Sequence, residues 1–362
     1  MKIVIVTNIP APYRLPIFEK IAKKLGDNFL VIFAARTEPN RSWNIGKLNF
    51  KHLFLNENIT EKSDGFNYVH NNPDIWKHLK KFNPDVIITT GFNPTHLYAW
   101  MYAKLFAKKH IPMTDGTLES EKHLSPLHKI IRKLVYATSH AFIGASTSSL
   151  KLFRNYNIPK ESIFQSHLCI NNEHFQNTLK FDDRPYDLMF SGQLTERKLP
   201  FLFADIAKKV SDQIKGIKVL ILGDGPLKKD LLERLKNDNI DYEYAGFVEQ
   251  KMLPLYYSQA KLFLFTTRLD PWGVVANEAL ASGTPVIVTP HAGVADDLVQ
   301  NSFNGYVLEA ESDVWAKYSV EILQDSAKWQ ILSENARKSV DQYTFENAAN
   351  GILNACEYTF GI

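Results

Sequence analysis

The sequence predicts an α/β protein with two domains, each built around a parallel β-sheet. Apolar runs typical of buried strands alternate with segments of helical periodicity along almost the whole chain. The length of 362 residues exceeds what one small hydrophobic core requires and suits two domains. The alternation lapses into polar, turn-prone residues at 171–186, and we expect a linker there.

The first alternation covers residues 1–170. Its predicted strands occupy residues 3–6, 29–34, 85–89 and 140–143. Its predicted helices occupy residues 15–25, 95–109 and 126–138. Runs rich in Val and Ile suit strands that are covered on both faces of a parallel sheet, because helices then pack on both sides.

The second alternation covers residues 187–344 and is followed by a helical segment at 345–362. Its predicted strands occupy residues 186–191, 217–222, 242–245, 261–265 and 285–288. Two Rossmann-like domains that face one cleft are the simplest arrangement of these elements. The final helix is long enough to reach back across the linker to the first domain.

The composition is that of a soluble globular protein, with 45% hydrophobic and 22% charged residues. Its two cysteines, Cys169 and Cys356, have neither the number of a disulfide framework nor the spacing of a zinc site. The N-terminal apolar run is too short for a signal peptide, and the longest uncharged stretch, 86–103, contains polar residues and a proline. We therefore expect a cytoplasmic protein that is not integral to a membrane.

Charge is distributed unevenly between the two halves of the chain. Residues 1–170 hold 23 Lys and Arg against 12 Asp and Glu, and the remainder holds 19 against 27. Four basic groups in the first half have helical spacing, and each is either a solvated helix face or part of a surface for an anionic partner. Those groups are Lys20/Lys23/Lys24, Lys77/Lys80/Lys81, Lys104/Lys108/Lys109 and Lys129/Arg132/Lys133. An anionic membrane surface or a phosphate-bearing acceptor fits them better than nucleic acid, for which no known motif is present.

The most informative segment is 263–288, an apolar strand, a turn, a short helix and a second apolar strand. Asp270 precedes the helix and Glu278 lies inside it. A helix N-terminus beside the carboxyl end of a strand is where open α/β sheets bind phosphorylated ligands. The alternative is an ordinary strand–helix–strand unit with solvated carboxylates.

Two further turns follow strands of the second domain. Arg197 and Lys198 open a helix after the strand 186–191, and together with backbone N–H groups they suit a diphosphate. Gly223 and Gly225 permit a tight turn after the next strand. The alternatives are a charged helix start on the surface and a plain strand–helix turn.

Several classes of chemistry lack their signatures. No Asp-x-Asp pair indicates a metal clamp, so Arg197, Lys198 and helix dipoles would neutralise a leaving group. The loop 7–14 lacks Gly-x-Gly-x-x-Gly, which argues against NAD. No Gly-x-Ser-x-Gly or Cys/His arrangement indicates a covalent hydrolase. We expect neither a metal nor a cofactor.

Together, the segments between Gly192 and Gly305 resemble the nucleotide-sugar site of family 4 retaining glycosyltransferases of the bacterial surface-polysaccharide type. That family places Glu, seven residues and Glu in this strand–helix–strand frame, and Asp270 stands where its first Glu usually stands. The resemblance implies the GT-B fold, with two Rossmann-like domains facing a cleft and a C-terminal helix crossing back. Residues 1–170 would bind the acceptor and residues 187–344 the NDP-sugar.

The resemblance also implies a role for each group. Glu278 would accept hydrogen bonds from the ribose hydroxyls, and Asp270 from hydroxyls of the donor sugar. The backbone at Trp272, Gly273 and Val274 would face the phosphates, and Arg197 and Lys198 would hold the diphosphate. The remaining donor-binding positions would be Gly192, Gly223, Gly225 and Phe247.

The first domain matches the family less closely. Asp115 stands where many relatives have an important His, so it is either a catalytic group on the acceptor side or a turn aspartate beside Gly116. We expect Tyr13 and Arg14, in the first strand–helix loop, to bind the acceptor. The catalytic set is then Asp115, Asp270, Arg197 and Lys198.

The expected function is the transfer of one hexosyl or acetamidohexosyl group from an NDP-sugar to a saccharide acceptor, with retention at the anomeric carbon. A lipid-linked acceptor and a peripheral location at the inner face of the cell membrane fit the basic first domain. The family's front-face mechanism lets the leaving phosphate accept the acceptor's proton and requires no protein nucleophile. An NDP-sugar epimerase of the same architecture and a non-catalytic nucleotide-sugar-binding protein are the alternatives.

Overall fold

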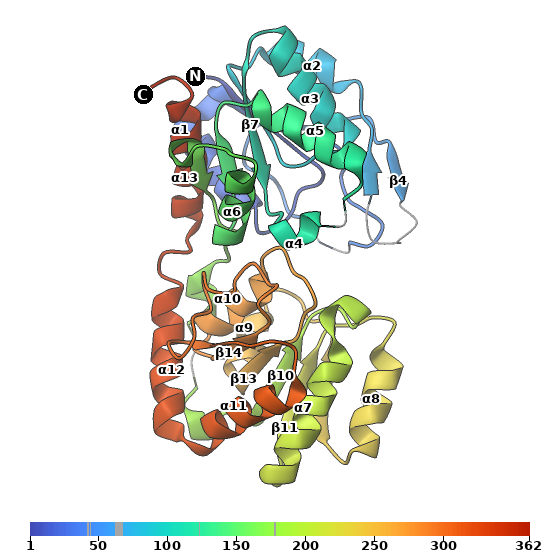
Figure 1. Cartoon of the computed structure of the whole chain (residues 1–362), viewed down its shortest axis with the longest axis vertical. Coiled ribbons are helices and arrows are strands. Elements are labelled where there is room, and N and C mark those ends of the chain that lie inside the picture. The colour runs from blue at the N-terminus through green and yellow to red at the C-terminus, as the bar shows by residue number, and fades with distance from the viewer. Residues whose placement is uncertain (42, 44, 62–67, 123, 177–178) are drawn as a thin grey trace. The chain divides into compact units, whose positions relative to one another are not determined.

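The computed structural model describes residues 1–362 apart from 42, 44, 62–67, 123 and 177–178 (Figure 1). The chain divides into two compact units. Unit 1 comprises Met1–Cys169 and Phe345–Ile362, and unit 2 comprises Ile170–Thr344. His123, near the predicted helix 126–138, lies outside the described residues.

Unit 1 is built on a seven-stranded sheet with the order β3-β2-β1-β6-β7-β8-β9. All neighbouring strands are parallel. The strands are β1 (Ile3–Thr7), β2 (Phe29–Phe33), β3 (His52–Phe54), β6 (Val86–Thr89), β7 (Lys109–Thr114), β8 (Phe142–Gly144) and β9 (Ile163–Gln165). A separate antiparallel pair is formed by β4 (Ile59–Glu61) and β5 (Tyr68–His70).

Helices pack against this sheet. They are α1 (Leu15–Leu25), α2 (Ile75–Phe82), α3 (Pro94–Leu105), α4 (Leu118–Glu121), α5 (Pro126–Ala137), α6 (Thr147–Asn155) and α13 (Phe345–Tyr358). The helix predicted to continue to Lys109 is wrong at its end, because α3 stops at Leu105 and Ala107 turns the chain with a φ of 51°. Lys109 instead begins β7, whose pairing with β6 is a long-range contact that local periodicity does not reveal.

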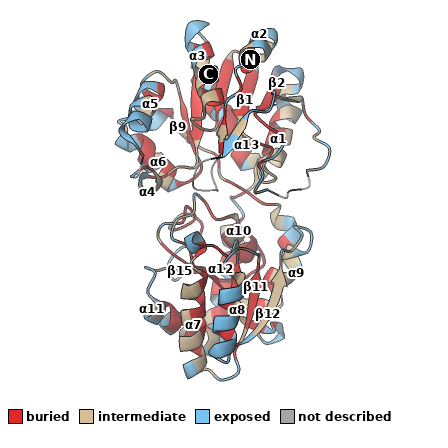
Figure 2. Ribbon diagram, turned by 90° about the vertical axis from the view of Figure 1, so that its right-hand side faces the viewer, coloured by how far each residue is buried: buried red, intermediate tan, exposed pale blue. Residues whose placement is uncertain are grey.

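Unit 2 is built on a six-stranded parallel sheet with the order β12-β11-β10-β13-β14-β15. The strands are β10 (Tyr186–Ser191), β11 (Lys218–Leu222), β12 (Asp241–Gly246), β13 (Ala260–Phe265), β14 (Val286–Val288) and β15 (Gly305–Val307). The helices are α7 (Pro200–Gln213), α8 (Lys228–Asn237), α9 (Leu253–Ser258), α10 (Val274–Ala281), α11 (Ser312–Gln324) and α12 (Ser326–Ser339). The central strands of both sheets are buried, whereas the outer strands β3, β9 and β12 are partly exposed (Figure 2).

Asn172, at the start of unit 2, makes specific contacts within that unit. The Asn172 side chain donates to the carbonyl oxygens of Val340 and Tyr343, at 2.9 and 3.2 Å. The same side chain accepts from Asn277 of α10 at 3.1 Å. The first and last segments of unit 2 are therefore joined at Asn172.

The C-terminal helix α13 belongs to unit 1, as the sequence predicted. Lys24 of α1 contacts Glu346 at 2.6 Å and donates to Asn350 at 2.7 Å. On another side, a Cβ atom on Gly351 would lie 1.8 Å from the carbonyl oxygen of Gln165 in β9. Glycine therefore permits the close approach of α13 to the sheet.

Both sheets are doubly wound. The chain first adds strands on one side of the first strand (β1 or β10) and then returns to add the others on its opposite side, which reverses the strand order at that point. The reversal lies between β1 and β6 in unit 1 and between β10 and β13 in unit 2. Open α/β sheets bind ligands outside the carboxyl ends of the strands at this point. No helix among the described residues combines the length and apolar character needed to cross a membrane.

Candidate functional site

In unit 2, the loops that follow β10 and β13 lie side by side at the reversal point. The Thr266 hydroxyl donates to the Lys198 carbonyl oxygen at 3.0 Å, and the Arg268 N–H donates to the Arg197 carbonyl oxygen at 2.8 Å. Thr266 and Lys198 are both buried. These bonds position the side chains of Arg197 and Lys198 beside the turn that contains Asp270.

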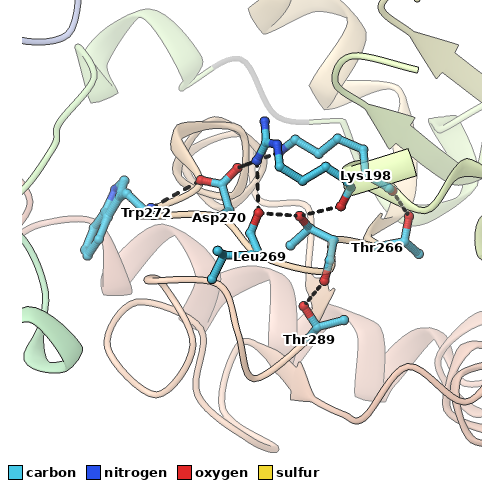
Figure 3. Close-up of polar contacts among 8 residues, drawn as sticks. Lys198, Thr266, Leu269, Asp270, Trp272 and Thr289 are labelled. Atoms are coloured by element: carbon cyan, nitrogen blue, oxygen red, sulfur yellow. Dashed lines mark hydrogen bonds and ion pairs between the residues drawn. The ribbon is translucent and has the colours of Figure 1, made fainter. Parts of the chain in front are cut away.

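Asp270 accepts hydrogen bonds from both predicted diphosphate cations (Figure 3). Its Oδ2 atom lies 2.6 Å from Lys198 Nζ and 3.1 Å from Arg197 Nη1. Its Oδ1 atom accepts from the Trp272 N–H at 3.2 Å. Because a carboxylate offers about four acceptor positions, roughly one remains for a ligand hydroxyl. We refer to Asp270, Arg197 and Lys198 as the ion cluster.

Burial and charge act in opposition within the ion cluster. Desolvation lowers the pKa of Lys198, although Asp270 partly restores it. Burial alone would raise the pKa of Asp270, but Lys198 and Arg197 hold it below its ordinary value. Two cations and one carboxylate leave a net positive charge beside the N-terminus of α10, whose dipole also favours an anion.

Glu278 lies on α10 and is almost completely buried. Burial raises the pKa of its carboxyl to about 7, although a hydrogen bond with the Tyr257 hydroxyl lowers it. The Tyr257 and Ser191 hydroxyl oxygens are 2.8 Å apart. When the Glu278 carboxyl is ionised it only accepts hydrogen bonds, so in that state the Tyr257 hydroxyl donates to Glu278 and the Ser191 hydroxyl donates to Tyr257.

Glycines allow the neighbouring loops of unit 2 to meet. Gly223 has a φ of 115°, and a Cβ atom on it would lie 1.9 Å from the carbonyl oxygen of Gly192. A Cβ atom on Gly225 would lie 2.5 Å from the carbonyl oxygen of Leu194. The predicted donor-binding glycines therefore hold the loops after β10 and β11 together.

Phe247 follows this glycine contact. The Gly223 N–H donates to the Gly246 carbonyl oxygen at 2.7 Å, which places the next residue beside the loop after β11. Phe247 is 68% exposed. An exposed aromatic ring at this position offers a stacking surface for a flat ligand.

The turn before α10 has a structural as well as a candidate binding role. The Trp272 side chain is buried, and the backbone N–H of Trp272 donates to Asp270 Oδ1. Gly273, with a φ of 107°, is the N-cap residue of α10. The phosphate contacts of Gly273 and Val274 stay a prediction. The Gly293 N–H donates to the Asp270 carbonyl oxygen at 2.9 Å. A Cβ atom on Gly293 would lie 2.0 Å from the Pro271 carbonyl oxygen, so only glycine fits here.

Unit 1 has a cavity of about 240 Å³ at its own reversal point. The predicted residues Tyr13, Arg14 and Asp115 line this cavity. Glu38 and Trp43, which the sequence did not indicate, also line it. The remaining lining residues are Thr7, Asn8, Ile9, Ala11, Phe18, Arg41, Thr90, Met113 and Thr114.

The cavity combines an aromatic wall with buried polar groups. The Tyr13 and Trp43 rings meet edge to face with centroids 6.2 Å apart. Glu38 contacts the buried His70 at 2.9 Å. Desolvation lowers the pKa of Arg14, Asp115 opposes this shift, and Arg14 Nη1 is buried without a hydrogen-bond partner among the described residues. An anionic or hydroxyl-rich ligand would satisfy this donor.

The missed residues carry no local signal. Tyr257 lies on the short helix α9 outside any motif, and its contact with Ser191 joins residues 66 positions apart. Glu38 and Trp43 follow β2, and neither of these two residues lies in a helix or strand. Only their position in the folded chain distinguishes them from ordinary polar and aromatic residues.

Two Rossmann-like units, with a buried carboxylate and a cation pair at the reversal point of unit 2, define an α/β protein equipped for phosphorylated ligands. Residues 171–339 match the family model described as "Glycosyl transferases group 1". This match lies within unit 2, and the fold of the chain is GT-B, as the sequence predicted.

Two known proteins resemble this chain, one in structure and one in sequence. The structure resembles that of HepE from Anabaena in complex with UDP, with a TM-score of 0.77 and 16% identity over 99% of this chain and 100% of the other. A GalNAc-α-(1→4)-GalNAc-α-(1→3)-diNAcBac-PP-undecaprenol α-1,4-N-acetyl-D-galactosaminyltransferase from Campylobacter jejuni is 23% identical, covering 72% of this chain and 71% of the relative.

Other matches are shorter. A 2-deoxystreptamine N-acetyl-D-glucosaminyltransferase from Niallia circulans is 27% identical over 35% of this chain. The matches span only 36% of that relative and 47% of a second, archaeal glycosyltransferase.

Proposed function

We propose that the protein transfers one sugar, with retention, from an NDP-sugar to a saccharide acceptor. The observation that carries the proposal is the ion cluster, followed by the buried Glu278 on α10, at the reversal point of a unit that matches the model of glycosyl transferases group 1. Such a site offers cations for a diphosphate and carboxylates for hydroxyl groups, which are the two parts of a nucleotide-sugar.

Unit 2 is the proposed donor site. Arg197 and Lys198 bind the diphosphate, Glu278 accepts from the ribose hydroxyls, and Phe247 lies against the base. The free acceptor position of Asp270 takes a hydroxyl of the donor sugar. UDP-sugars are the first candidates, because HepE was solved with UDP and with UDP-glucose.

The proposed chemistry requires no protein nucleophile. The bond between the anomeric carbon and the diphosphate oxygen breaks while the acceptor oxygen attacks from the same face. The departing diphosphate takes the proton of the acceptor hydroxyl. Lys198, Arg197 and the N-terminus of α10 stabilise the negative charge that develops on this leaving group. Transfer should therefore persist in excess EDTA.

Unit 1 is the proposed acceptor domain. Its cavity presents Tyr13, Arg14 and Asp115, with Asp115 as a group that orients the attacking hydroxyl. The name of the Campylobacter relative includes an undecaprenol-linked saccharide, which supports a lipid-linked acceptor in surface-polysaccharide or glycan assembly. Such an acceptor would place the enzyme at the inner face of the cell membrane.

The first experiment is saturation-transfer NMR with UDP-, GDP-, dTDP- and ADP-sugars. We expect one class to bind the wild type and Glu278→Ala to lose that signal. Glu233→Ala, an exposed carboxylate on α8, is the matched control and should bind normally. If Glu278→Ala binds every compound as the wild type does, the site assignment fails.

Turnover separates the proposal from its alternatives. An NDP-sugar epimerase would convert the bound donor without any acceptor, and a non-catalytic binding protein would leave it unchanged. We expect donor consumption to depend on added saccharide acceptor, followed as released nucleotide diphosphate.

A further inference from the structure

Helix α5 exposes a row of large apolar side chains. Leu127, Ile130 and Leu134 are 64%, 54% and 54% exposed. Their spacing of three and four residues places them on one face of the helix. Val135 and Tyr136, on a different face of α5, are buried in unit 1. We call the exposed row the α5 stripe.

The surroundings of the α5 stripe are cationic. Residues 122–160 contain seven Lys and Arg and no Asp or Glu. Lys129 and Lys133 are exposed on α5 itself. The acidic residues on the neighbouring α4 are already engaged, because Glu121 contacts Arg132 at 2.5 Å and Glu119 contacts Lys122.

An apolar row flanked by lysines matches one kind of surface. A solvated face would carry polar residues, and three large apolar residues on one face exceed the scattered exposure that is ordinary. Interfacial helices combine the same two features, apolar residues that enter the lipid and lysines that meet anionic headgroups. A second copy of this chain would bring like charges together. A nucleic-acid backbone has no apolar surface to cover Leu127, Ile130 and Leu134.

We propose that the α5 stripe docks on an anionic lipid bilayer, with Leu127, Ile130 and Leu134 among the acyl chains and Lys129 and Lys133 at the headgroups. The proposal rests on the proposed function, which it deepens by naming the surface that meets the membrane. Figure 2 shows α5 at the edge of unit 1, largely pale blue.

The test is co-sedimentation of the full chain with vesicles of phosphatidylglycerol and phosphatidylcholine, compared with phosphatidylcholine alone. One variant replaces the row (Leu127→Ser, Ile130→Ser and Leu134→Ser), and another reverses the charge (Lys129→Glu and Lys133→Glu). Ile331→Ser with Leu255→Ser is the matched control, since these apolar residues of unit 2 are 60% and 44% exposed. Thermal melts verify that all variants are folded.

We expect the wild type and the control to partition into anionic vesicles. Both α5 variants should bind about tenfold or more weakly, and high salt should weaken the wild type. Equal partition of wild type and α5 variants, or no wild-type binding to anionic vesicles, would overturn the proposal. So would a fall from dimer to monomer when the row is replaced, seen by analytical ultracentrifugation.

Donor binding by NMR distinguishes this proposal from the proposed function. We expect the α5 variants to bind the donor as the wild type does, because the substitutions lie in unit 1. Normal vesicle binding without any donor binding would contradict the enzyme assignment and leave the docking surface standing. Normal donor binding without vesicle binding would contradict the docking surface and leave the enzyme assignment standing.

Discussion

At the scale of single residues, Glu278 has the most unusual environment of the candidate site. Its carboxyl is buried, and the donors that hold it are hydroxyl groups rather than cations, in the order Ser191, Tyr257, Glu278. Asp270 has the opposite arrangement, with two cations and a backbone N–H. The two carboxylates therefore differ in charge state near neutral pH.

We predict that donor affinity rises with pH through about 7. Burial raises the pKa of Glu278 to about 7, so its carboxyl is largely neutral below that pH and largely ionised above it. Ribose hydroxyls donate more strongly to the ionised form. The association constant should fall up to about tenfold per pH unit below the midpoint. Calorimetric titrations across this range provide the measurement, and a Glu278→Gln variant should show a nearly flat profile.

We predict that Tyr257→Phe moves this midpoint to higher pH. The Tyr257 hydrogen bond lowers the pKa of Glu278, so its loss favours the neutral carboxyl. Loss of one hydrogen bond to a charged group should weaken donor binding near neutral pH by about tenfold. Tyr136→Phe, which removes a buried hydroxyl without a described hydrogen-bond partner, is the control. An unshifted pH profile in Tyr257→Phe would rule out this positioning role.

At the scale of secondary-structure elements, α10 is positioned at both ends. Gly273 begins it after the Asp270 turn. Beyond its C-terminus, Arg184 donates to the carbonyl oxygens of Ser282 and Gly283 at 3.0 and 3.3 Å, and to Thr284 Oγ1 at 2.6 Å. Arg184 also stacks over Trp329 at 4.7 Å. A residue of the predicted linker thus orients the helix that bears Glu278.

We predict that Arg184→Met lowers the free energy of unfolding of unit 2 by about 3 kcal/mol, because several buried carbonyl groups lose their donors. Urea unfolding followed by tryptophan fluorescence measures this change. Arg234→Met, on the exposed side of α8, should cost less than about 1 kcal/mol. Equal stability of the two variants would contradict the anchoring role.

At the scale of the whole chain, unit 1 is discontinuous in sequence. Its last helix, α13, follows unit 2 and returns to pack on α1 and β9. Gly351 permits the contact with β9, and Lys24 contacts the other side of α13. The folding of unit 1 therefore depends on residues synthesised after all of unit 2.

We predict that Gly351→Ala loosens unit 1 and leaves unit 2 unchanged. The added Cβ atom would overlap the Gln165 carbonyl oxygen at 1.8 Å, so α13 must move. Hydrogen exchange in β9 and α1 should accelerate about tenfold, with β13 as the internal reference. Gly46→Ala, where a Cβ atom meets nothing within 4 Å, is the matched control. Unchanged exchange in β9 would show that the contact is not required.

The fold class and the segments of the candidate site could be predicted from the sequence because their signals are local. Strand and helix periodicity, the turn at Gly223 and Gly225 and the 263–288 segment each lie within one continuous stretch of sequence. The expected return of the last helix, taken from the family resemblance, was also confirmed. The end of the helix predicted at 95–109 was wrong, since β7 is specified by its partners in the sheet.

The contacts that determine the pKa and the hydrogen-bond partners of each group could be identified only from the tertiary structure. Lys198 and Asp270 are 72 residues apart in the sequence, and Ser191 and Tyr257, whose hydroxyls are hydrogen-bonded, are 66 residues apart. Burial, which raises the pKa of Glu278 and lowers that of Lys198, depends on every element that excludes water from them. Local pattern thus indicates which residues lie at strand ends, whereas long-range packing determines which charges meet and which apolar residues, such as the α5 stripe, stay exposed.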